Sequence, residues 1–134
     1  MREILFRGKS LIDNEWVIGA GVYKSEGYTW IITDDATKAE NRGTGSDAII
    51  PETVGQYTGL TDKNGKRIFE GDIVKGAWGT VFVVFYDECY LQFRAKKADS
   101  YAREIDYYGF SHEIEVIGNI HDNPELLKES EDAE

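Results

Sequence analysis

The chain carries few residues that suit catalysis or metal binding: two histidines and one cysteine among 134 residues. His112 is followed by Glu113 and Glu115, and imidazole and carboxylate groups can both bind zinc. On an extended segment, however, His112 and Glu115 point to opposite faces. Since no cysteine cluster accompanies them, the pattern favours a solvated strand face, and we expect no metal or other cofactor.

His121 and Asp122 resemble a general base with its orienting acid, but neighbouring residues of an extended chain point apart. A turn explains this pair better. Cys89 would have to be a thiolate to act as a nucleophile, and the carboxylates of Asp87 and Glu88 beside it disfavour that form. We therefore expect Cys89 to be a small, half-buried residue.

The segment Asn41–Ser46 has the sequence NRGTGS, and its two glycines could cradle an anion. A phosphate-binding loop would continue into Lys-Ser or Lys-Thr and open a helix, and neither feature follows here. A flexible loop is the better interpretation. Since no catalytic constellation emerges, the sequence predicts that the protein is not an enzyme.

Aromatic residues are stronger candidates for binding. Trp78 lies in the segment Gly76–Gly79, at an expected turn between two strands, where an exposed tryptophan would be a binding anchor. Tyr57 is a second candidate, because it brings an aromatic ring to an expected sheet edge. For Trp16 and Trp30 we expect core packing, which is also the alternative for Trp78.

Charge weighs against nucleic acid as a partner. The formal net charge is −10, and residues 122–134 alone carry six acidic residues and one basic residue, a net charge of −5. Proteins that bind nucleic acid generally neutralise phosphates with Lys and Arg, so this composition disfavours such binding. A local basic patch is the alternative. Its members would be Lys66, Arg67 and Lys75, joined by Lys63, Arg94, Lys96 and Lys97.

Length and composition place the chain among small β-rich proteins. A chain of 134 residues suits one compact domain, and three Trp, eight Tyr and six Phe favour half-buried pleated surfaces. The single cysteine excludes an internal disulfide, and no apolar run approaches the roughly 20 residues that cross a membrane. The first residues also lack the apolar stretch of a signal peptide. We therefore expect a soluble cytoplasmic protein with no membrane partner.

Short apolar runs separated by glycines predict strands along most of the chain. The expected strands are Ile4–Phe6, Glu15–Lys24, Tyr28–Thr33, Ile49–Ile50, Val54–Leu60, Ile73–Val74, Thr80–Tyr86, Tyr90–Arg94, Ile105–Phe110 and Ile114–Ile117. Gly19 and Gly21 interrupt the second of them, as glycines do at bulges or close backbone approaches. Thr80–Tyr86 is nearly all apolar, so we expect both of its faces to be covered. The segment Asp34–Asp47 lacks apolar periodicity and is expected to be a loop.

Turn and helix signals complete the expected organisation. Asn64-Gly65 between apolar runs predicts a hairpin with a type I′ turn. Asn123 followed by Pro124 predicts a short helix, because Asn caps helices and Pro suits the first helical position. We expect one compact domain over residues 1–134. Its expected parts are an N-terminal β portion (1–50, with the loop 34–47), a barrel-like β portion (54–121) and an acidic tail (128–134).

Three segments of the chain together resemble the YopX family of phage and prophage proteins. They are Met1–Arg7 (MREILFR), Val54–Lys75 (VGQYTGLTDKNGKRIFEGDIVK) and Ile114–Leu127 (IEVIGNIHDNPELL). The segments occur in the family's order, cover about a third of the chain and span nearly all of it. The segment Gly8–Ile50 departs most from the family's pattern.

The resemblance implies a phage or prophage product, common in Gram-positive bacteria, with a mostly β fold and no established catalytic residues. It also implies the cytoplasm of the bacterial host, and the family's biochemical role is undefined. Gly71-Asp72 in the central segment precedes a strand, and Gly79, shortly after that segment, precedes the next one, as in SH3-like barrels. We therefore expect a small antiparallel barrel or sandwich with SH3-like elements in the C-terminal half.

Two functions are compatible with these features of the sequence. The first is a non-catalytic interaction protein that binds a host or phage protein. Homo-oligomerisation is a corollary of it, because β-proteins must cover or pair their sheet edges. The second is a nucleic-acid-associated accessory protein of phage replication or recombination, which would use the local basic patch.

Overall fold

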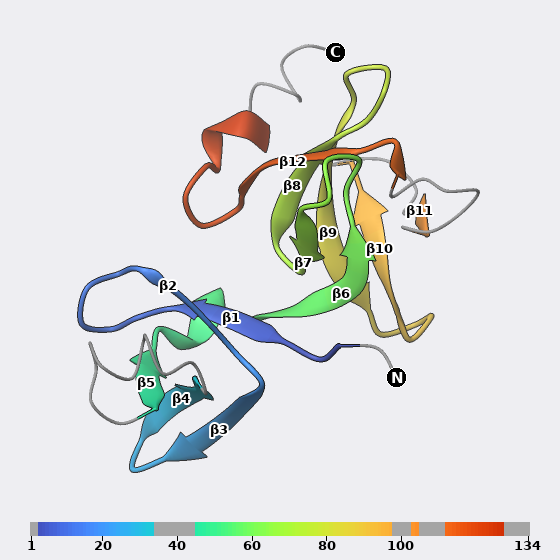
Figure 1. Cartoon of the computed structure of the whole chain (residues 1–134). Helices are drawn as coiled ribbons and strands as arrows, with labels where there is room; N and C mark the ends of the chain where they lie inside the picture. Colours follow the sequence, from blue (N-terminus) through green and yellow to red (C-terminus); the bar gives the residue numbers. More distant parts are fainter. Residues whose placement is uncertain (1–2, 34–44, 98–102, 105–111, 128–134) are drawn as a thin grey trace. The chain divides into compact units, whose positions relative to one another are not determined.

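The computed structural model describes residues 3–33, 45–97, 103–104 and 112–127 (Figure 1). The strands are β1 (Phe6–Lys9), β2 (Trp16–Gly19), β3 (Gly21–Ser25), β4 (Tyr28–Ile32), β5 (Ser46–Ile49), β6 (Gly55–Thr61), β7 (Arg67–Phe69), β8 (Asp72–Lys75), β9 (Val81–Asp87), β10 (Gln92–Lys96), β11 (Arg103–Glu104) and β12 (Glu115–Asn119). A 3-10 turn, η1 (Pro51–Thr53), precedes β6, and residues 125–127 are helical. In the described ranges, no helix has the length and apolar character needed to span a bilayer.

The strands form three sheets, with the orders β2-β1-β6-β7, β3-β4-β5 and β11-β10-β9-β8-β12. The strand pairs whose register is known are all antiparallel. The predicted mostly β, antiparallel fold with a short C-terminal helix is therefore confirmed. Across the described residues each sheet runs from one edge strand to another, so none closes into a barrel and the sandwich alternative fits better. The SH3-like character of the C-terminal half stays a prediction.

The chain divides into two compact units, Met1–Tyr57 and Thr58–Glu134. Strand β6 passes from the first unit into the second. Its first residues pair with β1, where Phe6 lies opposite Gln56, and its later residues belong to the second unit, where the Thr58 hydroxyl donates to the Ile68 carbonyl. The expectation of one domain with two portions stays a prediction.

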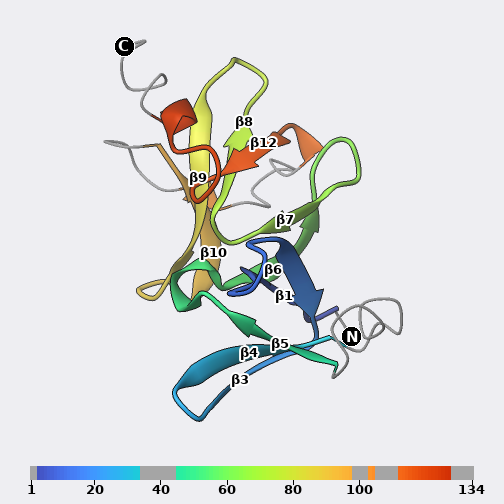
Figure 2. The same cartoon turned by 90° about the vertical axis from the view of Figure 1, so that its left-hand side faces the viewer.

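The first unit has two layers around a small core. Strands β1 and β2 form one layer, and β3, β4 and β5 form the other (Figure 2). The core consists of Val17 from β2, Ile31 from β4 and Ile49 from β5, all fully buried. Each of these strands therefore contributes one apolar side to the space between the layers.

Gly19 marks the point where the chain leaves one sheet for the other. The sequence predicts one glycine-interrupted strand here, and the structure shows two: β2 pairs with β1, whereas β3 pairs with β4. A Cβ atom on Gly19 would clash with the carbonyl oxygen of Ile32. The expected interruption is therefore confirmed, and a close approach of two backbones explains the glycine.

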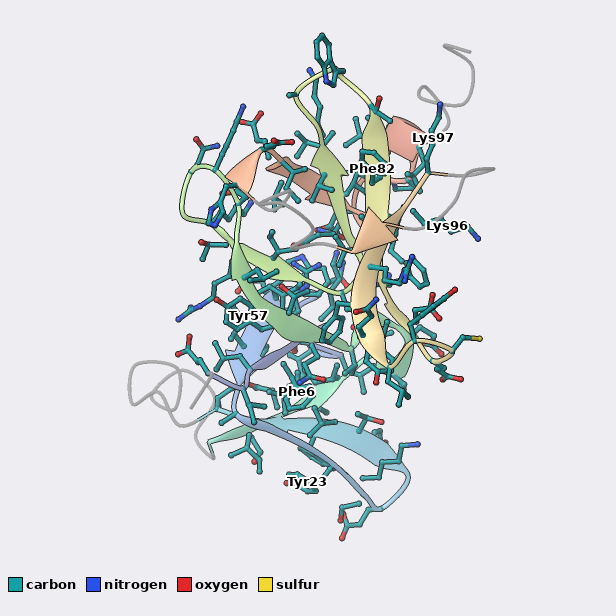
Figure 3. The ribbon with its side chains drawn as sticks, turned by 90° about the vertical axis from the view of Figure 1, so that its right-hand side faces the viewer. Phe6, Tyr23, Tyr57, Phe82, Lys96 and Lys97 are labelled. Carbon is teal, nitrogen blue, oxygen red and sulfur yellow. The ribbon has the colours of Figure 1, made fainter. Side chains whose placement is uncertain are left out.

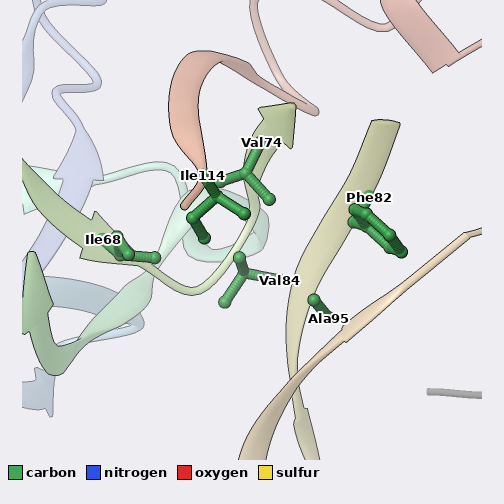
Figure 4. Packing of buried hydrophobic residues seen from close by; sticks show 6 residues of the cluster. All are labelled: Ile68, Val74, Phe82, Val84, Ala95 and Ile114. Atoms are coloured by element: carbon green, nitrogen blue, oxygen red, sulfur yellow. The ribbon is translucent and has the colours of Figure 1, made fainter. Parts of the chain in front are cut away.

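The core cluster of the second unit lies on one face of its five-stranded sheet. Its core residues, shown in Figure 4, are Ile68, Val74, Phe82, Val84, Ala95 and Ile114. Along β9, Phe82 and Val84 are buried, while Val81, Val83 and Phe85 are half-buried. The prediction that both faces of this strand are covered is confirmed in part. On the other face Val81, Val83 and Phe85 are half-buried, and Ile73, which lies opposite Val83, is fully buried.

The expected loop Asp34–Asp47 lies mostly outside the described residues, as does most of the segment Asn41–Ser46. Its end is described and is not a loop. Ser46 and Asp47 begin β5, where they pair with Ile32 and Ile31 of β4. That part of the prediction is wrong, because a partner strand distant in sequence extends the sheet. The expected strand Ile105–Phe110 also lies outside the described residues.

Candidate functional site

The β8–β9 hairpin ends in a turn, Gly76–Thr80, whose backbone positions Trp78. The N–H of Gly76 donates to the Thr80 carbonyl at 2.8 Å, and the N–H of Gly79 donates to the Gly76 carbonyl at 3.0 Å. Gly79 has a φ of +85°, in the left-handed region that side chains rarely adopt. This pattern matches the hairpin loop in which a type I turn is followed by one left-handed residue.

The side chain of Trp78 is 96% exposed. In Figures 1 and 2 the β8–β9 hairpin extends beyond the neighbouring strands of its unit. A tryptophan normally buries most of its indole, so core packing, the alternative for this residue, is wrong. The hairpin therefore presents a large apolar side chain on a hydrogen-bonded backbone.

The three basic candidates are exposed but stand on different elements of the second unit. Lys66 ends the β6–β7 turn, Arg67 begins β7 and Lys75 ends β8. Acidic residues accompany two of them. Lys75 lies opposite Glu115 in the β8–β12 pairing, and Lys66 acts electrostatically on Asp62. Their positive charge is therefore partly offset locally.

Tyr57, the other aromatic candidate, lies in β6 and is labelled in Figure 3. Its side chain is 8% exposed, and its backbone N–H donates to the Leu5 carbonyl at 2.8 Å. Little of the ring is available to a partner in this conformation. Its role in binding stays a prediction, and the exposed surface favours Trp78 as the anchor.

Asp62 holds the β6–β7 turn together. One carboxylate oxygen accepts the N–H groups of Asn64 and Lys66 at 2.9 and 2.8 Å, and the other accepts the N–H of Val116 in β12 at 2.9 Å. Burial disfavours the charged carboxylate, but these hydrogen bonds and the charge of Lys66 outweigh it and lower the pKa of Asp62 below its ordinary value. An ionised Asp62 therefore links the turn to β12.

The turn around Asn64 and Gly65 is a hairpin turn, as predicted, but its type differs. Gly65 has a φ of +82°, whereas Asn64 has no positive φ, so the prediction of type I′ is wrong. The N–H of Asp62 donates to the Lys66 carbonyl at 2.7 Å, and the N–H of Gly65 donates to the Asp62 carbonyl at 3.0 Å. This is the pattern of the β8–β9 turn. The carboxylate of Asp62 reinforces this turn by accepting the N–H groups of Asn64 and Lys66 inside the loop.

A second buried acid, Asp72, also serves the backbone. Its carboxylate accepts the N–H of Phe69 at 2.7 Å across the turn between β7 and β8. The neighbouring Gly71 donates its N–H to the Val84 carbonyl at 2.8 Å and accepts the N–H of Ile120 at 2.9 Å. The Gly-Asp pair therefore joins β9 and the end of β12 to the start of β8.

The residues considered for chemistry lie in structural turns. Over the part of the chain that the structure describes, no group of three His, Cys, Asp or Glu side chains could hold a metal ion. The side-chain oxygen of Asn119 accepts the N–H groups of His121 and Asp122, which form the expected turn. Cys89 is exposed, and its N–H donates to the carboxylate of Asp87. The prediction of a half-buried Cys89 is wrong, because the loop after β9 turns it toward solvent.

Sequence reasoning missed an aromatic face on the β3-β4-β5 sheet. Tyr23 lies opposite Trp30, with ring centroids 6.3 Å apart and ring planes 13° apart, and Tyr28 meets Trp30 edge-on at 6.2 Å. Trp30 is half-buried and lies outside the core, as does Trp16, so the prediction of core packing is wrong for both. The signal available was the spacing of Tyr28, Trp30 and Ile32, which places alternate residues of a strand on one face.

Comparisons with known proteins extend over nearly the whole chain. A family model described as YopX protein matches residues 5–128. Among solved structures, the crystal structure of protein EF1440 from Enterococcus faecalis is similar, with 24% sequence identity and a TM-score of 0.54. That match covers 95% of this chain and 99% of the other. At this identity the likeness concerns the fold. No curated protein matches the chain.

Proposed function

Because the chain belongs to the YopX family, we propose that it is a non-catalytic protein-interaction module anchored by Trp78. The observation that carries this proposal is the 96% exposure of Trp78 in a turn with a defined backbone. We propose that the partner is a host or phage protein in the bacterial cytoplasm. The resemblance to phage and prophage proteins supports that part of the proposal.

The energetics of the turn suit an anchor. Tryptophan is enriched among residues whose truncation costs about 2 kcal/mol or more of binding free energy. The hydrogen bonds at Gly76 and Gly79 order the backbone before binding, so association costs little further loop entropy. A pocket on a partner protein that holds the indole would bury most of the apolar area that this turn exposes.

The use of the buried acids supports a role without catalysis. In the segment that resembles the family most closely, Asp62 and Asp72 each accept backbone N–H groups. Both carboxylates therefore contribute to holding strands and turns. Trp78, in contrast, lies on the surface next to that segment.

The proposal is tested by affinity capture with the full-length chain and its Trp78→Ala variant. Host lysate is passed over both, and retained proteins are quantified by mass spectrometry and then titrated individually. We expect Trp78→Ala to weaken the binding of a specific partner about 30-fold, a loss typical of a hot-spot residue. Tyr90→Ala is the control, because Tyr90 is also exposed, at 65%, in a hairpin loop of the same unit. Equal retention of the partner by Trp78→Ala contradicts the proposal.

Size-exclusion chromatography with light scattering covers the case in which the partner is a second copy. Self-association through Trp78 predicts a larger mass for the unmodified chain than for Trp78→Ala. The same mass for both variants removes Trp78 from any oligomer interface.

The alternative, a nucleic-acid accessory role, rests on the exposure of Lys66, Arg67 and Lys75. It predicts salt-dependent binding of single- or double-stranded oligonucleotides, weakened by Lys75→Glu. Fluorescence anisotropy at low salt measures it. No binding under those conditions removes this alternative.

A further inference from the structure

A second surface lies in the first unit, on the outer side of the β3-β4-β5 sheet. Strand register places its members on one face, because residues directly opposite in neighbouring strands point the same way. Trp30 lies between Tyr23 and Ala48, and a Cβ on Gly21 would come 3.2 Å from Cδ1 of Ile32. We call this surface the outer aromatic face; its residues are Tyr23, Tyr28, Trp30, Ile32 and Ala48.

The other side of the same sheet is already packed. Ile31 and Ile49 are fully buried against Val17, so the apolar residues of that side have their partners. On the outer aromatic face, in contrast, Tyr23 and Ile32 are each 41% exposed. Figure 3 shows Tyr23 on the side of the sheet that points away from Phe6. The exposed rings therefore add little to the core of this unit.

The protein covers two other aromatic rings with its own cations. The guanidinium carbon of Arg7 lies 4.7 Å from the ring centroid of Trp16, and that of Arg94 lies 4.3 Å from the ring centroid of Tyr90. Lys9, directly opposite Trp16, adds a second cation at 5.6 Å. Such contacts are attractive because the face of an aromatic ring is electron-rich. Aromatic rings at the surface of this fold are therefore suited to cationic side chains, and both rings described here have a guanidinium group over them.

The outer aromatic face presents the same kind of ring in another setting. In the described part of the chain, Tyr23 and Tyr28 contact Trp30, and no cationic side chain of the chain itself lies over these three rings. The indole N–H of Trp30 donates to the Ser25 carbonyl at 3.2 Å, which satisfies its polar group. The ring faces are what remains for a ligand.

Charge favours a basic partner, because the first unit (Met1–Tyr57) is itself acidic, with nine acidic and six basic residues. The chain has a net charge of −10 and a pI of about 4.7, which attracts basic proteins and repels phosphates. We propose that the outer aromatic face docks an arginine-bearing segment of a basic protein, with guanidinium groups stacked on Trp30 and its two tyrosines. This surface belongs to the first unit and does not depend on Trp78 in the second.

The test uses the full-length chain and a fluorescein-labelled peptide of alternating arginine and glycine, with the matching lysine-glycine peptide as comparison. The key variant is Tyr23→Lys, because Tyr23 lies opposite Trp30 as Lys9 lies opposite Trp16. The ammonium group of the introduced lysine should cover the ring of Trp30, on which the guanidinium groups of the peptide would stack. Tyr90→Lys is the matched control, since it adds the same charge at an exposed tyrosine of the second unit.

We expect the arginine peptide to bind more tightly than the lysine peptide, because guanidinium stacks better on aromatic rings. Tyr23→Lys and Tyr28→Ser should each weaken binding of the arginine peptide about fivefold. Tyr90→Lys and Trp78→Ala should leave that binding unchanged. Thermal melts followed by circular dichroism show that the variants fold.

Three results of the peptide measurements overturn the proposal. They are no binding of the arginine peptide, equal binding of both peptides, and equal weakening by Tyr23→Lys and Tyr90→Lys, which would indicate net charge alone. A neutral glucan oligosaccharide or a single-stranded oligonucleotide serves as the competing probe. Either probe could bind the unmodified chain. If Tyr28→Ser then abolishes binding of that probe but not binding of the arginine peptide, the face has a different ligand. Because Trp78→Ala is measured in parallel, failure here is separate from failure of the Trp78 anchor.

Discussion

Two turns of the second unit, Asp62–Lys66 and Gly76–Thr80, share one backbone geometry. In both, the first residue's N–H donates to the fifth residue's carbonyl, at 2.7 and 2.8 Å. The fourth residue is a glycine with positive φ in each case, +82° at Gly65 and +85° at Gly79. The backbones of the two loops are therefore equivalent position by position.

The side chains at the first and third positions differ. Asp62 fills the first position of one turn and ties it to β12, whereas Gly76 stands there in the other. The third position holds Asn64 in one turn and the 96% exposed Trp78 in the other. One loop geometry therefore serves either strand assembly or surface display, and side chains at two positions decide which.

The largest expected effect is that of Asp62→Ala, which should lower the free energy of unfolding by about 3 kcal/mol. The change leaves the N–H groups of Asn64, Lys66 and Val116 without their acceptor. Urea unfolding followed by circular dichroism measures it. A loss below about 1 kcal/mol would mean that Asp62 does not distinguish the two turns.

The stabilisation by Asp62 should also depend on pH. Its pKa in the folded protein lies below the ordinary value of 3.8, so the folded state favours the ionised form. The contribution is complete above that ordinary value and is lost as pH falls through the lower folded pKa. Unfolding of the unmodified chain and of Asp62→Asn is compared from neutral pH to about pH 2. The two stability curves should converge at the acid end, and a constant difference would contradict the assignment.

Alanine at the fourth position tests whether the backbones are equivalent. Gly65→Ala and Gly79→Ala should each cost about 1–2 kcal/mol, because positive φ strains an L-residue. A Cβ at either site meets no atom within 4 Å, so packing adds nothing to the cost. Equal losses of unfolding free energy, measured with urea, support the equivalence of the two backbones. A loss in only one of the two variants contradicts it.

The smallest expected effect on stability is that of Trp78→Ala, within about 0.5 kcal/mol of the unmodified chain. The indole is almost fully exposed, so its removal loses little packing. The variant should therefore separate folding from binding, with unchanged thermal unfolding and weakened capture of the partner. A clear drop in unfolding free energy would show that Trp78 serves the fold, as Asp62 does.

Much of the fold could be predicted from local signals. β-branched and aromatic runs marked most strands, and Asn64-Gly65 marked a hairpin because glycine accepts positive φ. The turn type was misjudged because an Asn-Gly pair fits more than one kind of hairpin turn. The hydrogen bond that the N–H of Val116 donates to Asp62, 54 residues away, could not be predicted, because it joins distant parts of the chain. The end of the Asp34–Asp47 segment was misjudged for the same reason, since β4 recruits Ser46 and Asp47 into a sheet.

The candidate sites divide in the same way. Glycines on both sides of Trp78 were enough to place it in a turn, and the sequence by itself determined the family, the antiparallel β character and the acidic charge. Only the tertiary structure decided how far each aromatic is exposed. Exposure depends on which strands pack against a face, and those contacts join residues distant in the chain. The register of β3 and β4 therefore revealed the aromatic face that residue types alone had assigned to the core.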